Sequence, residues 1–175
     1  VLCGGYLCHQ IKEYFLNYPK LNSDFSIDLS NGSVEFFDRV NEKWRVVILD
    51  TGYETETGER LHLSKDYLRT DSPFLLTYGD TVTNLNLDRL INFHHSHNSP
   101  VTITVAEQPG RYGAVEFDDS GNVILFGEKN DGVGAFINRG YFLIEPSILE
   151  ELGGNLSWEN EVLPDLVERQ MVKAF

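Results

Sequence analysis

The sequence predicts an α/β protein, a three-layer sandwich built on a mostly parallel, mixed β-sheet. Apolar runs of strand length alternate along the chain with segments whose apolar residues recur at helical spacing. This alternation of strand, helix and strand favours parallel strands joined by right-handed crossovers. With 175 residues, of which 41% are hydrophobic and 23% charged, the chain can bury a sizeable core. We therefore expect one domain over residues 1–175.

The first elements predicted are a strand, a helix and a hairpin. Residues 1–3 form an apolar run that ends at Gly4 and Gly5, and a helix is expected to follow until Pro19 stops it. The apolar residues at helical spacing in this helix are Leu7, Ile11, Tyr14, Phe15 and Tyr18. Residues 25–29 and 34–37 alternate between apolar and polar across Asn31 and Gly32, which predicts a hairpin of half-buried strands off the main sheet.

Two later strands end in acidic residues. Residues 46–49 are followed by Asp50, and an apolar run from residue 74 ends in Gly79 and Asp80. In open α/β sheets, ligands bind outside the carboxyl ends of the strands. The carboxylate of Asp80 suits Mg²⁺, which prefers hard oxygen ligands. Gly79 allows a ligand to approach the backbone closely.

The rest of the chain predicts a helix, a strand, a hairpin, a strand and a helix. Asn86 can cap a helix that leads to a strand at residues 101–105. Residues 112–117 and 123–126 form an antiparallel hairpin by their short connection, and residues 135–144 form one more buried strand. Ser157 can cap the last helix, in which Pro164 is expected to cause a kink.

The charge of the chain excludes one class of partner. Fourteen basic and twenty-seven acidic residues give a net charge of −13, whereas nucleic-acid binding relies on clustered Lys and Arg. An acidic membrane surface is disfavoured for the same reason, and a triphosphate substrate would need Mg²⁺ and local positive groups. No apolar run approaches about 18 residues, so we expect a soluble cytoplasmic protein.

Histidines and cysteines offer weaker candidates for a metal site. His94, His95 and His97 fall at the end of the helix capped by Asn86, where the helix dipole favours protonated, exposed histidines. Cys3 and Cys8 lack a second Cys or His pair to complete a zinc set. We therefore interpret both groups as structural.

Five segments carry a more specific signal. They are residues 50–61 (DTGYETETGERL), 77–80 (TYGD), 110–114 (GRYGA), 126–129 (FGEK) and 136–141 (FINRGY). In this order they resemble the sugar-phosphate nucleotidyltransferases, most closely the glucose-1-phosphate cytidylyltransferases. The resemblance covers the whole chain and implies a Rossmann-like nucleotidyltransferase fold.

The resemblance also implies a reaction and a set of site residues. A sugar 1-phosphate attacks the α-phosphorus of a nucleoside triphosphate, here CTP with glucose 1-phosphate, to give CDP-glucose and pyrophosphate. Such a reaction needs alignment and charge neutralisation more than an acid or base. The implied roles are Mg²⁺ binding for Asp80, nucleotide binding for Thr55, Arg60 and Gly79, and sugar-phosphate binding for Gly113, Glu128, Lys129 and Asn138.

Other features of the family are missing from this chain. The Gly-rich signature of the family has no counterpart here, and the second Mg²⁺ ligand would fall beyond Phe175. We therefore expect an internal fragment that is inactive alone, from a family whose members are commonly homo-oligomers. The alternatives are transfer from dTTP, UTP or GTP, and a non-catalytic module that binds sugar phosphate or assembles with itself. A nucleotide-sugar glycosyltransferase is disfavoured, because such an enzyme usually has an Asp-x-Asp motif at its metal site, and no two Asp residues in this chain are two positions apart.

Overall fold

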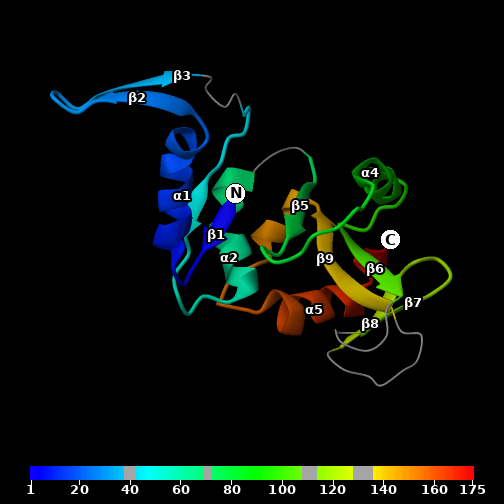
Figure 1. Ribbon diagram of the computed structural model, residues 1–175. Helices are drawn as coiled ribbons and strands as arrows, with labels where there is room; N and C mark the ends of the chain where they lie inside the picture. Colours follow the sequence, from blue (N-terminus) through cyan, green and yellow to red (C-terminus); the bar gives the residue numbers. More distant parts are fainter. Residues whose placement is uncertain (38–41, 69–71, 108–113, 128–135) are drawn as a thin grey trace. The chain divides into compact units, whose positions relative to one another are not determined.

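The computed structural model describes residues 1–37, 42–68, 72–107, 114–127 and 136–175 (Figure 1). The chain forms two compact units, Val1–Thr55 and Glu56–Phe175. Both mix helices and strands, which confirms the α/β class. Within the described residues, no helix has the length and apolar character needed to cross a membrane.

The first unit is built on two parallel strands and one helix. Strand β1 (Leu2–Gly4) pairs with β4 (Ile48–Asp50), and α1 (Cys8–Leu21) follows β1 after a tight turn. A Cβ added to Gly4 would lie 2.2 Å from the sulfur of Cys8, which is buried at the start of α1. The close approach of helix and strand therefore requires glycine at this position.

Helix α1 continues past Pro19, contrary to our prediction. It ends at Leu21, where the Asn22 amide donates to the Tyr18 carbonyl at 3.1 Å. Pro19 lies in the last turn, so its missing N-H removes only one helical hydrogen bond. The predicted hairpin is present as β2 (Asp24–Asp28) and β3 (Ser33–Phe37). Its strands are exposed rather than half-buried, and only Phe36 is partly covered.

The second unit contains a six-stranded sheet in which β9 (Phe136–Ile144) is central. The strand order is β10-β6-β9-β7-β8, and β5 also pairs with β9. The other strands are β5 (Phe74–Thr77), β6 (Val101–Glu107), β7 (Ala114–Phe117), β8 (Val123–Gly127) and β10 (Val172–Ala174). The helical segments of this unit are α2 (Thr57–Leu63), α3 (Lys65–Leu68), α4 (Leu87–His95), α5 (Leu163–Glu168), a 3₁₀ turn at Pro146–Glu150 and a π-helical turn at Trp158–Val162.

The prediction of a mostly parallel sheet is wrong for the described strands. β9 runs antiparallel to β5, β6 and β7, and only β6 and β10 form a parallel pair in this sheet. β5 and β6 do run in the same direction, as their connection through α4 predicts. However, β9 inserts between them, and hydrophobic periodicity does not report which strands become neighbours.

Both predicted helix caps of this unit are confirmed. The Asn86 side chain accepts a hydrogen bond from the Arg89 amide at 3.0 Å, and Ser157 Oγ accepts from the Asn160 amide at 3.2 Å. The helix after Ser157 begins with the π-helical turn and becomes α-helical at Leu163. This change falls directly before Pro164, which has no N-H to donate to the preceding turn.

The core of the second unit lies between the sheet and the C-terminal helical segments. Phe142 and Trp158 are its largest fully buried side chains, and their rings meet edge to face at a centroid distance of 5.7 Å. Phe142 makes a second edge-to-face contact, at 6.1 Å, with Tyr78 just after β5. The core therefore supports the strand end that carries Gly79 and Asp80.

Candidate functional site

Gly79 and Asp80 are exposed at the carboxyl end of β5, as the sequence predicts. Among the described residues, no atom lies within 4 Å of a Cβ built on Gly79, so one side of the backbone is open there. The Asp80 carboxylate forms no hydrogen bond or ion pair with any other described residue. An accessible, unpaired carboxylate beside open backbone fits a Mg²⁺ ion that bridges protein and phosphate.

Tyr78, directly before this pair, is anchored by a hydrogen-bond network. Its hydroxyl donates to one carboxylate oxygen of Glu159. The other oxygen of Glu159 accepts from the Thr57 hydroxyl at 2.6 Å, and Thr57 Oγ1 in turn accepts from the Trp158 amide at 2.8 Å. Burial, reinforced by Glu159, raises the pKa of Tyr78 far above its usual value. The phenol therefore stays protonated and remains a donor at any physiological pH.

This network connects the end of β5 to the helix that carries Arg60. Thr57 is the first residue of α2, and Arg60 lies half-buried in the same helix. The segment of residues 50–61 is therefore helical from Thr57 onward. Gly58 explains the local structure, because its amide donates to the Leu156 carbonyl at 3.0 Å and a Cβ there would lie 2.6 Å from that oxygen. The helix thus begins in close contact with the segment before Ser157.

Thr55 is the last residue of the first unit, and it closes the loop after β4. Its hydroxyl donates to the Thr51 carbonyl, and the Thr51 hydroxyl donates to the Gly4 carbonyl at 2.8 Å. Gly52 adopts a left-handed φ of 96°, and a Cβ there would lie 2.8 Å from the Thr55 hydroxyl. Lys12 pairs with Asp50 at 3.0 Å and holds the pKa of that carboxyl below its ordinary value. The loop is therefore fastened to both β1 and α1.

Asn138 lies on an irregular part of β9 that contacts the end of β5. Its side-chain oxygen accepts from the Gly140 amide at 2.8 Å, where the register between β6 and β9 shifts. Gly140 has a φ of 74°, and a Cβ there would lie 2.8 Å from the Tyr78 ring and 3.1 Å from the Thr81 methyl group. The bulge therefore packs against the segment that carries Gly79 and Asp80, and brings Asn138 to the same region.

Gly113, Glu128 and Lys129 lie outside the described residues. Among the described residues, Ala114 of β7 pairs with Gly127 of β8 on one side and with Ile137 of β9 on the other, so these three residues share one row of the sheet.

Comparison with known proteins gives the family. A family model described as "Nucleotidyl transferase" matches residues 28–172. The chain is 37% identical to a glucose-1-phosphate cytidylyltransferase of Salmonella typhi over 176 residues, which cover 100% of this chain and 68% of that protein. A probable glucose-1-phosphate cytidylyltransferase of Bacillus subtilis is 35% identical over 96% of this chain and 65% of its own length. The chain belongs to the nucleotidyl transferase family.

Solved structures agree with this nucleotidyltransferase fold. The crystal structure of HddC from Yersinia pseudotuberculosis superposes with a TM-score of 0.70, covering 99% of this chain and 67% of that one at 21% identity. A putative glucose-1-phosphate thymidylyltransferase from Bacillus anthracis gives a TM-score of 0.58 over 69% of this chain. At 21% and 13% identity, these likenesses concern the fold alone.

Sequence reasoning missed the residues that support the candidate site through Tyr78. Glu159 follows the cap Ser157 in the first turn of a helix, where an acidic residue usually complements the helix dipole. Tyr78 and Thr57 are distant from it in the sequence, and no spacing connects the three. Only the pairing of β5 with β9 and the packing of the last helix bring them together.

Replacing Glu159 tests this network. Because Glu159→Gln removes the charge that accepts from Tyr78 and Thr57, we expect the free energy of unfolding in urea to fall by about 1–3 kcal/mol. The matched control is Glu168→Gln, an exposed acid of α5 for which we expect a change within about 0.5 kcal/mol. Adding Tyr78→Phe to Glu159→Gln should lower the free energy of unfolding only slightly further, because the hydrogen bond between the two residues is already weakened. Full additivity of the two substitutions would contradict the coupling.

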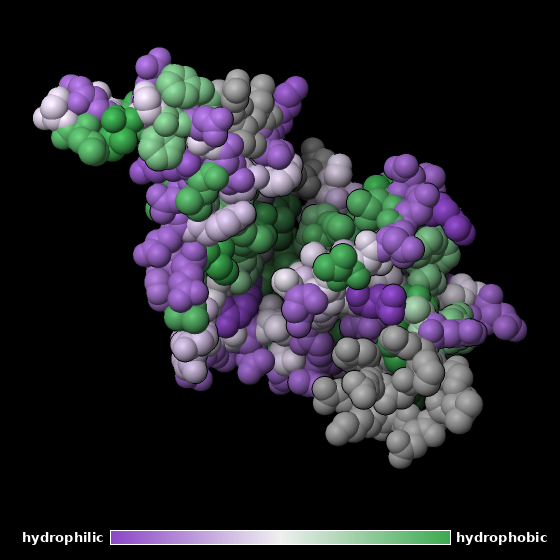
Figure 2. All heavy atoms as spheres, in the orientation of Figure 1, coloured by the Kyte–Doolittle hydropathy of each residue, from purple (hydrophilic) through white to green (hydrophobic). Residues whose placement is uncertain are grey.

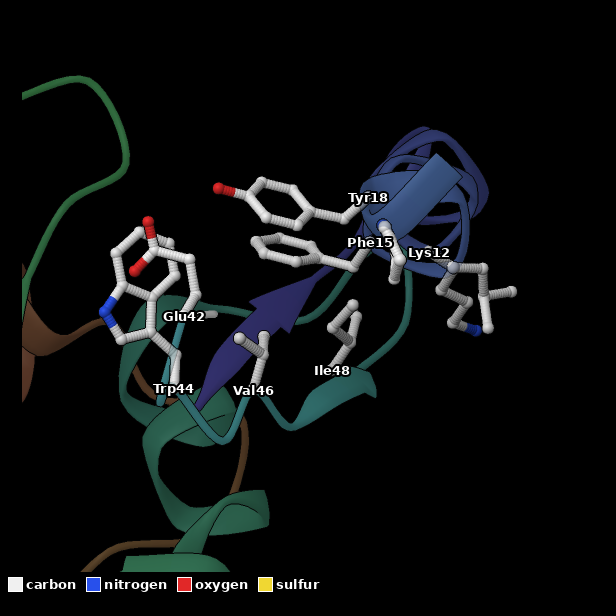
Figure 3. Close-up of a pocket in the computed structure, with 9 residues that line it drawn as sticks. Lys12, Phe15, Tyr18, Glu42, Trp44, Val46 and Ile48 are labelled. Carbon is white, nitrogen blue, oxygen red and sulfur yellow. The ribbon is translucent and has the colours of Figure 1, made fainter. Parts of the chain in front are cut away.

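The first unit contains a separate apolar pocket of about 520 Å³ between α1 and the segment before β4 (Figure 3). Phe15 and Tyr18 project from α1 with nearly parallel rings, and the Tyr18 ring lies 6.3 Å from that of Trp44. The pocket is lined by Lys12, Phe15, Leu16, Tyr18, Pro19, Glu42, Trp44, Val46 and Ile48. None of the predicted site residues belongs to it.

The expectation of exposed histidines on α4 is wrong for His94. Its side chain is buried, with Nδ1 2.7 Å from the Thr102 hydroxyl and Nε2 3.2 Å from a carboxylate oxygen of Glu145. His97 reaches the same Thr102 hydroxyl at 3.1 Å, whereas His95 is exposed. His94 follows the buried Leu90 by one helical turn, so it belongs to the face of α4 that is buried, whereas the adjacent His95 points away from that face.

His94 should make stability depend on pH. Burial lowers its pKa, and the hydrogen bond to Glu145 only partly opposes this effect. Because the folded-state pKa lies below the unfolded-state value, the stabilisation is complete above about pH 6.5 and is lost as the pH falls through the folded-state pKa. We expect the free energy of unfolding to drop less between about pH 7.5 and 5.5 in His94→Gln than in the parent chain. If the free energy of unfolding falls equally in His94→Gln and in the parent chain, groups other than His94 cause the pH dependence.

Proposed function

We propose that the protein transfers a cytidylyl group from CTP to α-D-glucose 1-phosphate, giving CDP-glucose and pyrophosphate. The observation that carries this proposal is the exposed, unpaired carboxylate of Asp80 beside the open backbone of Gly79, at the carboxyl end of β5. The choice of cytosine and glucose is supported by the similarity to glucose-1-phosphate cytidylyltransferases over the whole chain.

The reaction needs little acid-base chemistry, because the sugar phosphate is already a nucleophile. Mg²⁺ held by Asp80 would neutralise charge on the triphosphate, which matters in a chain with a net charge of −13. Arg60 would add a fixed positive charge whose planar fork matches phosphate oxygens. Thr55 and Gly79 would bind the nucleotide, and Tyr78, held by Glu159, would keep the strand end rigid.

The sugar phosphate would bind at the neighbouring part of the sheet. Asn138 lies on the bulge of β9 that packs against the end of β5, and its side chain is partly exposed. Gly113, Glu128 and Lys129 complete the proposed subsite, where Glu128 would accept sugar hydroxyls and Lys129 would neutralise the phosphate. Transfer would then depend on aligning the phosphate oxygen of glucose 1-phosphate with the α-phosphorus of CTP.

Calorimetry tests the proposed substrates on the 175-residue chain. In the presence of Mg²⁺, we expect CTP to bind at least ~10-fold more tightly than dTTP, UTP or GTP, a discrimination of about 1.4 kcal/mol. Glucose 1-phosphate and CDP-glucose are titrated in parallel, and pyrophosphate release is followed with both substrates present. Binding without turnover would identify a binding half-site in this chain. Failure of a folded chain to bind any of these ligands, or tighter binding of another triphosphate, would overturn the assignment.

A further inference from the structure

The first unit exposes large apolar or aromatic side chains in several places, and two of these groups are compact. One is the apolar face of the β2-β3 hairpin, which includes Phe25 and Ile27, and Figure 2 shows hydrophobic side chains at the surface of this hairpin. The other is a pair of tyrosines, Tyr6 and Tyr53, which expose 73% and 67% of their surface. The hairpin contains no residue of the candidate site, whereas Tyr53 comes two positions before Thr55. The tyrosine pair is therefore the group that adjoins the candidate site.

The rings of Tyr6 and Tyr53 are in contact with each other. Their centroids lie 5.6 Å apart and their planes are inclined at 64°, so the edge of one ring meets the face of the other. This arrangement is favourable, because the ring edge is positive and the ring face is negative. A tyrosine side chain has only two torsions, so it binds a ligand at a small cost in conformational entropy. The pair therefore forms a preformed aromatic surface.

The backbone places both tyrosines at the carboxyl ends of parallel strands. Tyr6 follows β1 and Tyr53 follows β4, and these two strands pair in parallel. The two loops are joined through Thr51, whose amide and hydroxyl donate to the Gly4 carbonyl at 2.9 Å and 2.8 Å. In open α/β sheets, ligands bind outside this end of the strands. The aromatic surface thus lies where a ligand is expected.

Each tyrosine also adjoins a residue with a left-handed backbone. Leu7, directly after Tyr6, has a φ of 56°, and Gly52, directly before Tyr53, has a φ of 96°. Glycine adopts such a conformation readily, whereas leucine is strained in it. The Cys8 amide fastens the turn around Leu7 by donating to the carbonyl of residue 5 at 3.0 Å. Strained residues of this kind cluster at binding and active sites, so the turn that carries Tyr6 has a further mark of a ligand site.

We propose that Tyr6 and Tyr53 form an aromatic platform on which the base of the nucleotide stacks. A nucleobase is planar and uncharged, so its binding to the rings is not opposed by the net charge of −13. Thr55, to which we assign nucleotide binding, belongs to the same loop as Tyr53, and its hydroxyl donates to the Thr51 carbonyl. The inference rests on the proposed function for the choice of a nucleotide as ligand. It does not rest on the choice of cytosine, because every base can stack on an aromatic ring.

Calorimetry with Mg²⁺ tests the platform with two ligands, CTP and tripolyphosphate, of which only CTP has a base. Tyr6→Leu and Tyr53→Leu should each weaken CTP binding by roughly 10-fold or more, as expected when a base loses its aromatic partner. Binding of tripolyphosphate and of glucose 1-phosphate should stay within about 2-fold of the parent chain, because neither ligand has a base to stack. Tyr53→Phe retains the ring and should bind CTP within about 3-fold of the parent chain.

The matched control is Tyr67→Leu, which removes a tyrosine of α3 that is 53% exposed and should bind every ligand as the parent chain does. Because Tyr6 and Tyr53 are exposed, circular dichroism should show that their variants remain folded. Nuclear magnetic resonance adds a readout that altered folding would not imitate. The ring signals of Tyr6 and Tyr53, assigned from the two Tyr→Phe variants, should shift upfield when CTP is added, whereas the Tyr67 signals should not move.

The outcomes separate the platform from the proposed function. If the parent chain binds CTP and both leucine variants bind it equally well, the platform is overturned and the proposed function stands. If the parent chain prefers another triphosphate and both variants bind that ligand more weakly, the choice of cytosine fails and the platform stands. Equal losses for CTP and tripolyphosphate, a loss for glucose 1-phosphate instead, or a folded parent chain that binds no nucleotide would each overturn the platform.

Discussion

Replacing Asp80 by alanine is expected to abolish the effect of Mg²⁺ on nucleotide binding. The parent chain should bind CTP more tightly with Mg²⁺ than with EDTA, whereas Asp80→Ala should bind equally in both conditions. If the parent chain turns over substrate, we expect the rate of Asp80→Ala to be lower by roughly 100-fold or more. Losses of this size follow when a group that stabilises developing charge is removed. Calorimetry with and without Mg²⁺ measures the first effect, and pyrophosphate release measures the second.

Two further variants make the Asp80 result specific. Asp80→Asn keeps the shape of the side chain but removes its charge, so it should lose most of the Mg²⁺ effect. Asp119→Ala removes an exposed acid from the turn between β7 and β8, and should behave as the parent chain. A Mg²⁺ dependence that survives in Asp80→Ala would place the metal elsewhere and would leave the strand end without its proposed role.

Truncation of Phe142 should have the largest effect on stability. This ring is fully buried in the middle of β9 and packs edge to face against both Tyr78 and Trp158. Phe142→Ala leaves a cavity at this junction, and we expect the free energy of unfolding to fall by about 3–5 kcal/mol. The control is Ile124→Ala on β8, whose side chain is 61% exposed and whose loss should cost less than about 1 kcal/mol.

Urea denaturation of the two variants measures this difference. Because Phe142 also supports the Tyr78 ring, the variant that remains folded should bind CTP less tightly, even though residue 142 does not belong to the candidate site. A loss of stability below about 1 kcal/mol in Phe142→Ala would mean that the core closes around the missing ring. In that case Tyr78 would be held by the Glu159 network alone.

Several elements could be predicted because their signals are local. Asn86 and Ser157 cap helices through hydrogen bonds to residues three positions later, so the chain around each residue is sufficient to place it. The hairpin at Asn31 and Gly32 is equally local. The strand that ends in Gly79 and Asp80 is recognisable from an apolar run followed by residues that expose backbone and carboxylate.

The error at Pro19 is local, whereas the other errors arise where non-local packing decides. The Pro19 prediction assumed that proline stops a helix at once, but in a last turn only one hydrogen bond is lost. His94 and His95 are neighbours with the same helix dipole, yet the contact with Thr102 and Glu145 buries only His94. The hairpin strands alternate as half-buried strands do, but in this chain the described residues leave their apolar face uncovered.

The sequence by itself determined the family, the types of most elements and the strand end that carries the candidate metal ligand, because these depend on residue chemistry and short spacing. Only the tertiary structure decided that β9 inserts between β5 and β6, and that Glu159 and Thr57 hold Tyr78 behind Asp80. The physical reason is that hydrophobic periodicity indicates which face of a helix or strand is buried. Strand order and buried polar contacts depend instead on which distant segments of the chain pack against that face.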